Sequence, residues 1–181
     1  MKSVIPLFLI VLIVACDKQK HKDVGVFKDL VDNEIVVIIL ANYGLDSIPA
    51  EIGQLKNAKS LTISYDSITD GWTVYPPLNA LVKRIDLPPY NYLPEEILEL
   101  KYLENLSLRD LNIKTLPGEF YKLENLKYLD LSMNKLILSN EIKKLAGLKN
   151  LKELLVFGNR VDSSDIKKLK VENPDLLVTY K

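Results

Sequence analysis

The sequence predicts an α/β solenoid, in which short coils stack in one direction and share a curved parallel sheet. Three observations predict it: an aliphatic pattern recurring every 21 to 25 residues, a proline-containing motif within the same period, and polar residues alternating with the aliphatic ones. A coil of this length cannot bury its own apolar side. Each coil is therefore expected to be stabilised by packing against its neighbours.

The aliphatic pattern is clearest in Leu126-Lys-Tyr-Leu129-Asp-Leu131, which continues to Asn134 and Leu136. Aligning its copies predicts six repeats, which start at Ile35, Ala58, Val82, Leu103, Leu126 and Leu151. We expect the fourth and sixth residues of each repeat to point inward on a short strand, with the intervening residues facing solvent. The inward pairs are Ile38 and Leu40, Leu61 and Ile63, Ile85 and Leu87, Leu106 and Leu108, Leu129 and Leu131, and Leu154 and Val156.

The return limbs of the coils are predicted to carry short helices. Ile48-Pro49, Leu93-Pro94 and Leu116-Pro117 are each followed by apolar residues at a spacing of three. This spacing favours a 3₁₀ helix with proline at its first position, where the missing N–H is not needed. The fifth repeat lacks the proline, and its residues Ile142, Leu145 and Leu148 predict an α-helix.

Both ends of the stack need a cap, because an end coil otherwise exposes its core. At the N-terminal end a short helix behind Asp23 is expected to carry Val24, Phe27, Leu30 and Val31. At the C-terminal end Ser163 or Ser164 is expected to cap a helix that carries Ile166 and Leu169, followed by a final strand over residues 176–180.

The repeat resembles the leucine-rich repeat family, which implies a horseshoe with the sheet on its concave wall. In that family an asparagine at the ninth position bonds the backbone of the turns, forming a ladder through the stack. Asn134 and Asn159 match this position. The ladder is expected to be partial, because the other repeats have different residues there, namely Tyr43, Asp66, Tyr90 and Leu111.

The start of the chain looks like a targeting segment. A positive charge at Lys2 precedes an apolar run over residues 4–15, which is too short to span a bilayer comfortably. The run ends in Ile13-Val14-Ala15-Cys16, which resembles the lipobox of bacterial lipoproteins. That resemblance implies cleavage before Cys16 and lipidation of its thiol; the alternative is an ordinary secretory signal with an incidental cysteine.

The predicted organisation is a signal peptide over residues 1–15, a lipidated Cys16 with a polar tether to residue 23, and a repeat domain over residues 24–181. Cys16 is the only cysteine, so no intramolecular disulfide is possible. The 24 basic and 24 acidic residues balance, which argues against a nucleic-acid surface. We expect a monomer attached to the cell envelope, at the outer membrane, through its lipid anchor.

The sequence offers little for catalysis. The single histidine, His21, lies in the tether, and no metal-ligand spacing or phosphate-binding glycine loop occurs, so neither a metal nor a cofactor is expected. The one pair to consider is Asp86 and Asp130, which the alignment places two strands apart with Ser107 between them. Adjacent strands are about 4.8 Å apart, so a hydrolase using this pair is an alternative, but solvated charges on an open sheet are the simpler explanation.

Binding is the favoured function, because the outward strand residues are not dictated by the core. An unidentified protein or peptide is the expected partner, and a glycan stacked on Tyr residues and Trp72 is the alternative. The outer sides of the end strands are apolar too, at Val37, Ile39, Ala41, Leu155 and Phe157; covering by capping segments is the favoured expectation, and a partner site is the alternative. The candidate ligand-binding residues are Arg84, Asp86, Asn105, Ser107, Arg109, Tyr128, Asp130 and Phe157.

Overall fold

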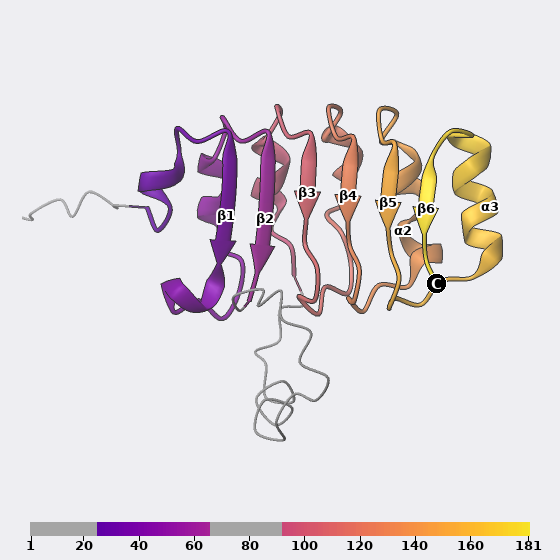
Figure 1. Ribbon diagram of the computed structural model, residues 1–181, viewed down its shortest axis with the longest axis horizontal. Helices are drawn as coiled ribbons and strands as arrows, with labels where there is room; N and C mark the ends of the chain where they lie inside the picture. The colour runs from indigo at the N-terminus through magenta and orange to yellow at the C-terminus, as the bar shows by residue number, and fades with distance from the viewer. Residues whose placement is uncertain (1–24, 66–91) are drawn as a thin grey trace, which may run out of the picture.

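The computed structural model describes residues 25–65 and 92–181. Within them, six strands form one sheet in chain order, and every neighbouring pair is parallel (Figure 1). The predicted parallel solenoid is therefore confirmed. The strands are β1 (Ile35–Ile39), β2 (Ser60–Ser64), β3 (Asn105–Ser107), β4 (Tyr128–Asp130), β5 (Glu153–Leu155) and β6 (Leu177–Thr179).

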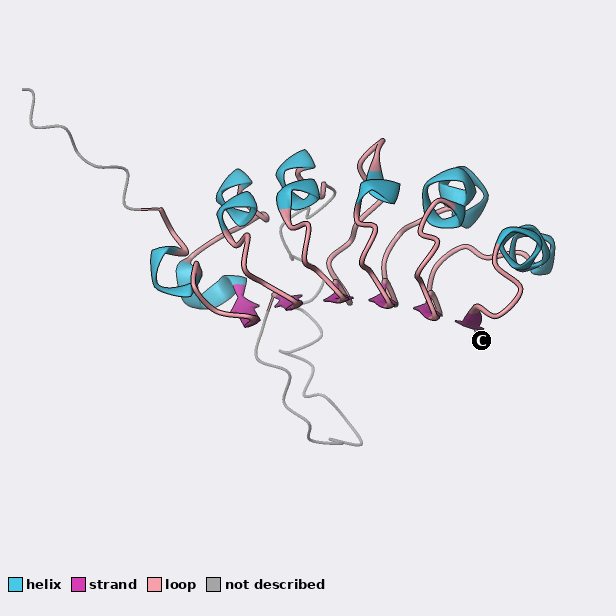
Figure 2. Ribbon diagram, turned by 90° about the horizontal axis from the view of Figure 1, so that it is seen from above, coloured by secondary structure: helices cyan, strands magenta, loops and turns pink. Residues whose placement is uncertain are grey.

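Helices form the second layer. The helices of the return limbs lie behind the sheet and fan out more widely than the strands, so the sheet is on the concave side (Figure 2), whereas the short helix after β1 lies at the end of that strand (Figure 1). Among the described residues, no helix has the length and apolar character needed to cross a membrane. The helices are η1 (Lys28–Leu30), η2 (Leu40–Tyr43), η3 (Ala50–Gln54), η4 (Glu95–Glu99), η5 (Phe120–Lys122), α2 (Leu138–Ala146) and α3 (Ser163–Glu172).

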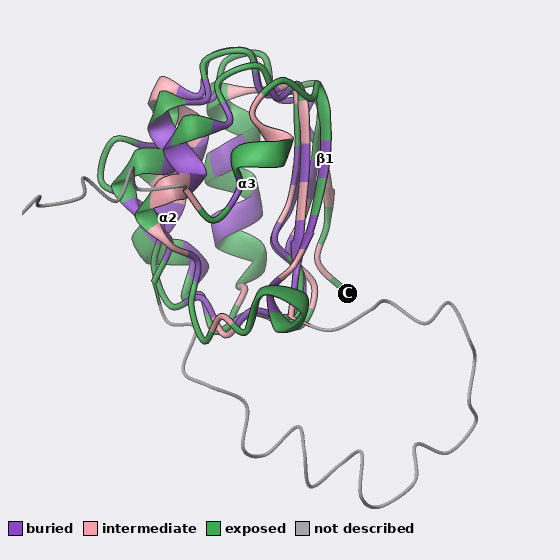
Figure 3. Cartoon of the chain, turned by 90° about the vertical axis from the view of Figure 1, so that its left-hand side faces the viewer, coloured by how far each residue is buried: buried purple, intermediate pink, exposed green. Residues whose placement is uncertain are grey.

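The core runs between the two layers as one continuous apolar cluster (Figure 3). Every described residue that was predicted to point inward from a strand is at most 1% exposed. Strand neighbours in this core match position for position, as Leu61 with Leu106 and Leu129 with Leu154. Such matching buries the aliphatic side chains of successive coils against one another, which is the main source of stability in a stack.

The first repeat has a different register from the predicted one. Val36 pairs with Leu61 and Ile38 pairs with Ile63, so the repeat is displaced by two residues. Ile35, the predicted first residue of this repeat, is 74% exposed. The segment from Ile35 to Leu40 is apolar throughout, so the sequence pattern does not show at which residue the repeat begins. The packing of the coil against its neighbour sets the register instead.

The predicted third repeat is not a coil between the second and the fourth. β2 pairs directly with β3, where a strand beginning at Val82 was expected to intervene. The limb that carries Pro94 therefore closes the coil of β2, and its helix η4 packs against η3. A Cβ atom on Gly53 of η3 would lie 2.9 Å from the backbone oxygen of Glu96 in η4, so glycine permits this close approach. Val82, Ile85 and Leu87 lie outside the described residues.

The return limbs confirm the predicted 3₁₀ helices and α2. The prolines sit earlier than expected: Pro49 and Pro94 are the N-cap residues of η3 and η4 rather than their first residues, and Pro117 lies two positions before Glu119, the N-cap of η5. The carbonyl oxygens of Pro49 and Pro94 accept bonds from the amides of Ile52 and Ile97, at 3.1 and 3.2 Å. An N-cap needs an extended backbone and no free amide of its own, and both conditions suit proline.

The asparagine ladder is partial, as predicted. The amide oxygen of Asn134 accepts bonds from the backbone amides of Leu111 and Ile113, at 3.1 and 3.0 Å, in the preceding coil. Asn159 accepts a bond from the amide of Leu136 at 3.0 Å in the same manner. Leu111 occupies the equivalent position as a buried apolar residue, while Asp66 and Tyr90 lie outside the described residues.

The N-terminal cap is shorter than predicted. It is the single 3₁₀ turn η1, preceded by Phe27 without a side-chain cap. Phe27 is buried against the first coil and meets Tyr43 edge-on, with ring centroids 5.4 Å apart. Asp23 and Val24, which were expected to begin this helix, lie outside the described residues.

The C-terminal cap has the predicted helix and strand, but a different residue caps the helix. Asp162 is the N-cap of α3, and it forms a reciprocal capping box with Asp165. The expected caps Ser163 and Ser164 are instead the first two helical residues. A carboxylate at this place is favoured because it bonds the free amides and complements the helix dipole.

Candidate functional site

The outer face of the sheet is the surface formed by strand residues that point away from the core. Register aligns these residues in rows that cross the strands. The first row contains Ile35, Ser60, Asn105, Tyr128, Glu153 and Leu177. The second contains Val37, Thr62, Ser107, Asp130, Leu155 and Thr179.

Beyond β3, β4 and β5 a third row follows, made of Arg109, Ser132 and Phe157. The backbone amide of Asp110 donates to the carbonyl of Ser132 at 3.0 Å, and that of Met133 donates to the carbonyl of Phe157 at 2.8 Å. These bonds keep the three coils in register past the ends of the strands. Six of the predicted binding residues therefore share one surface, whereas Arg84 and Asp86 lie outside the described residues, as do Cys16 and Trp72.

Arg109 reaches along the third row to Phe157. Its guanidinium carbon lies 5.2 Å from the centroid of the Phe157 ring, within the range of a cation–π contact. Ser132 is between them in the row, and it is fully buried. The contact therefore forms a preorganised cationic and aromatic platform across three coils, which the alignment could not reveal because it is made by side-chain conformation.

Asp130 and Ser132 differ from the expectation that outer residues are solvated. Asp130 is only 7% exposed, and its Oδ1 accepts a bond from the amide of Ser132 at 2.8 Å. The hydroxyl of Ser132 has no hydrogen-bond partner among the described residues. The simple explanation of Asp130 as an exposed surface charge is thus wrong. The centre of the outer face is recessed and polar.

Tyr128 is half-buried beside these groups. Burial raises the pKa of Tyr128 above its usual value, and the negative charges of Asp130 and Glu153 raise it further, while Arg109 opposes the shift. Two carboxylates and one guanidinium therefore act electrostatically on the Tyr128 phenol. The phenol remains protonated at neutral pH and can donate a hydrogen bond to a ligand.

Among the residues that the structure describes, no segment covers the outer side of β1. Val37 is 59% exposed and Ile35 more so, although a covering segment was the favoured expectation for these apolar residues. Ile39 and Leu155 are half-buried. Apolar side chains exposed on a strand add contact area for a partner at that end of the outer face.

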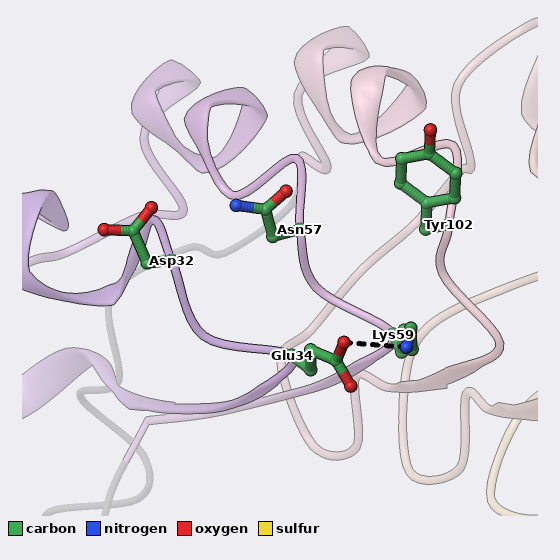
Figure 4. A pocket seen from close by; sticks show the side chains of 5 residues that line it. All are labelled: Asp32, Glu34, Asn57, Lys59 and Tyr102. Carbon is green, nitrogen blue, oxygen red and sulfur yellow. Dashed lines mark hydrogen bonds and ion pairs between the residues drawn. The ribbon is translucent and has the colours of Figure 1, made fainter.

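A second concavity lies at the edge where the strands begin (Figure 4). Asp32, Glu34, Asn57, Lys59 and Tyr102 line it, and all five are exposed. Lys59 pairs with Glu34 at 2.7 Å, as the dashed line in Figure 4 shows. Exposed pairs of this kind contribute little, and the shallow lining does not enclose a ligand. This edge is a weaker candidate than the outer face.

The same edge has an asparagine row that the sequence analysis missed. Asn57, Asn125 and Asn150 each donate from the side-chain amide to a carbonyl of the preceding coil, at 3.2, 2.7 and 2.8 Å. The signal was present as an asparagine directly before the first repeat position. Tyr102 stands at this position in the coil of β3 and lines the concavity of Figure 4 together with Asn57.

Comparison with known proteins gives structural matches alone. No protein-family model matches the chain, and no curated protein matches it. A leucine-rich repeat protein of Leptospira interrogans is 26% identical, with a TM-score of 0.48, over 74% of this chain and 34% of that one. The leucine-rich repeat ectodomain of the receptor kinase SOBIR1 from Arabidopsis thaliana is 27% identical, with a TM-score of 0.49, over 75% and 61%. Internalin C2 of Listeria monocytogenes is 20% identical, with a TM-score of 0.48, over 72% and 45%.

The chain thus spans less than two thirds of the length of each of these proteins. Its own geometry decides the architecture: one strand per coil, parallel order throughout, inward aliphatics in register, and asparagines that bond the turns. The fold is a leucine-rich repeat solenoid.

The hydrolase alternative placed Asp86 and Asp130 on strands separated by one neighbour. The strand predicted between β2 and β3 is not there, since these two strands are adjacent, and Asp86 lies outside the described residues. Among the residues that the structure describes, no group of three or more His, Cys, Asp or Glu side chains is arranged to hold a metal ion. What the outer face offers is contact area, a cation–π platform and polar groups.

Proposed function

We propose that this chain is a lipid-anchored envelope protein whose leucine-rich repeat domain binds a protein or peptide through its outer face. The observation that carries the proposal is the arrangement of Arg109, Phe157 and Tyr128. These are large side chains of the types that dominate interface energetics, on a surface where the core does not require them. The exposed Ile35 and Val37 extend this surface at the β1 end.

A photo-crosslinking experiment tests the outer face. A photoreactive amino acid placed at Asn105 should form adducts with a partner in living cells, identified by mass spectrometry. Adding Arg109→Ala and Tyr128→Ala is expected to reduce adduct yield at least about tenfold, since loss of an interface anchor costs more than about 1.4 kcal/mol. Thermal unfolding should change little, because both side chains lie outside the core.

Matched controls are Tyr102→Ala and Arg160→Ala, an exposed tyrosine and an exposed arginine that do not belong to the three rows. These should leave the adduct yield unchanged. If the control pair and the outer-face pair reduce it equally, the binding surface is elsewhere.

The anchor is proposed from the sequence around Cys16, where an apolar run ends in a lipobox-like tetrapeptide. A single acyl chain gives marginal membrane binding, whereas two or more chains hold a protein stably. A polar segment from residue 17 to residue 23 would then separate the domain from the lipid surface.

Metabolic labelling tests the anchor directly. In a bacterial host that processes lipoproteins, the full chain should incorporate labelled palmitate and fractionate with membranes, with the outer membrane as the expected fraction. Cys16→Ala should abolish labelling, while a conservative change in the apolar run, Val11→Leu, should preserve it. Equal labelling of the wild type and Cys16→Ala would remove the lipid anchor from the proposal.

A further inference from the structure

The carboxylate of Asp130 is an unpaired charge in a recessed place. The side chain is 7% exposed, and its one hydrogen bond in the described structure is the 2.8 Å contact from the Ser132 amide to Oδ1. In the part of the chain that the structure describes, every ion pair is made by other acidic residues. Buried carboxylates are ordinarily paired with a cation, since leaving water without one costs free energy.

The nearby cation of the protein is engaged elsewhere. Arg109 lies two residues beyond Ser107, the β3 partner of Asp130, but its guanidinium is drawn over Phe157 at 5.2 Å rather than forming an ion pair with Asp130. The other charged neighbour on the outer face is Glu153, which pairs with Tyr128 across β4 and β5. Beside Asp130 the outer face therefore has a second carboxylate, Glu153, and the Tyr128 phenol, and the charge of Arg109 also acts on that phenol.

An independent observation concerns the next outward residue of the same segment. The hydroxyl of Ser132 is fully buried and has no hydrogen-bond partner among the described residues. A buried hydroxyl without a partner is uncommon in folded proteins, and a bound water or ion is one explanation for such a group. An unpaired carboxylate and a buried, unpaired hydroxyl therefore lie two residues apart, at Asp130 and Ser132.

We propose that Asp130 is the specificity-determining residue of the outer face and receives an arginine side chain of the partner. This inference rests on the proposed function and names the chemistry of the ligand. A guanidinium presents five N–H donors in a planar fork, so it can bond Asp130 while other donors turn towards the Tyr128 oxygen or Glu153. The Tyr128 ring offers a face on which the same cation can stack. Arginine is preferred over lysine because an ammonium is a compact point charge without this planar fork.

The test uses nitrogen-15-labelled protein and acetylated, amidated pentapeptides that differ in one central residue. The residue is arginine in the probe, citrulline in a neutral isostere of the same shape, and glutamate in a charge-reversed control. The amide of Ser132 reports directly, because it donates to Asp130. We expect the arginine peptide at millimolar concentration to shift this amide resonance and to bind at least about tenfold more tightly than the citrulline peptide, as charge-assisted hydrogen bonds require.

Asp130→Asn separates charge recognition from structure. The asparagine keeps an oxygen for the Ser132 amide, so the fold should persist, while affinity for the arginine peptide should fall to that for citrulline. Asp46→Asn, an exposed aspartate outside the outer face, should leave the preference intact. Retention of the arginine preference in Asp130→Asn would overturn the proposal.

The outcomes also separate this inference from the proposed function. Equal shifts of outer-face amides by arginine and citrulline peptides would overturn the arginine receptor and leave binding by the outer face in place. If the arginine peptide causes no shift while Asn105 still cross-links a partner in cells, only the arginine-receiving role of Asp130 is overturned. If the outer-face variants and the control variants reduce cross-linking equally, the proposed function itself is contradicted.

Discussion

Asn134→Ala is expected to destabilise the protein by at least about 3 kcal/mol, because several buried backbone groups lose their partner together. The amide oxygen of Asn134 bonds the amides of Leu111 and Ile113, at 3.1 and 3.0 Å. Its amide nitrogen donates to the carbonyl oxygens of Leu108 and Leu131, at 2.7 and 2.9 Å. Asn134 is 1% exposed, and each buried group left unpaired costs about 1–3 kcal/mol.

Urea unfolding, followed by circular dichroism, measures this loss, and two other asparagines provide a graded series. Asn159→Ala should cost less, because its bonds are part-buried. Asn150→Ala should cost least, since its single bond to the Glu124 carbonyl is exposed. Equal losses at the three positions would contradict the view that the buried hydrogen bonds of these asparagines set the energy.

The sequence was sufficient for the positions whose chemistry repeats. Leu106, Leu129 and Leu154 recur at one period, and a buried strand position selects for such residues independently of what the neighbouring loops do. The same holds for Asn134 and Asn159, whose amide bonds both donors and acceptors of a turn. Because the same residue type recurs at the same repeat position, each of these predictions is supported by several repeats.

The predicted register was wrong where apolar and polar residues do not alternate clearly. Around β1 every residue from Ile35 to Leu40 is apolar, so two registers fit the alternation equally well. Near Val82 the spacing of aliphatic residues predicts a strand between β2 and β3, yet the pairing of Leu61 with Leu106 makes these two strands neighbours. Pairing depends on which coils pack together, and spacing along one chain does not contain that information.

The outer face was predictable as a surface but not as a site. Alternation placed Asn105, Tyr128 and Asp130 on one side of the sheet, as the structure confirms. The recess at Asp130 and the contact of Arg109 with Phe157 arise from rotamers and from the packing of three coils. The alternation of residues along a strand says nothing about rotamers or about packing between coils. The burial of a charged outer residue such as Asp130 therefore needed the structure.

Leu108→Ala is expected to cost about 2–5 kcal/mol, like other truncations of large residues in packed cores. Leu108 is fully buried, and its backbone amide donates to the carbonyl of Asp130 at 2.8 Å in the next coil. In a stack, each coil is stabilised mainly by its two neighbours, so a cavity in this central coil weakens both interfaces at once. Thermal or urea unfolding measures the loss.

Ser107→Ala is the matched control, because Ser107 precedes Leu108 on the same chain segment and points to the outer face. Its effect should lie within about 0.5 kcal/mol, as for other substitutions away from the core. The two changes differ by one position and by the side of the sheet they affect. A loss for Leu108→Ala as small as that for Ser107→Ala would mean that the side chains do not alternate as the register requires, and the outer face would then not be the surface described.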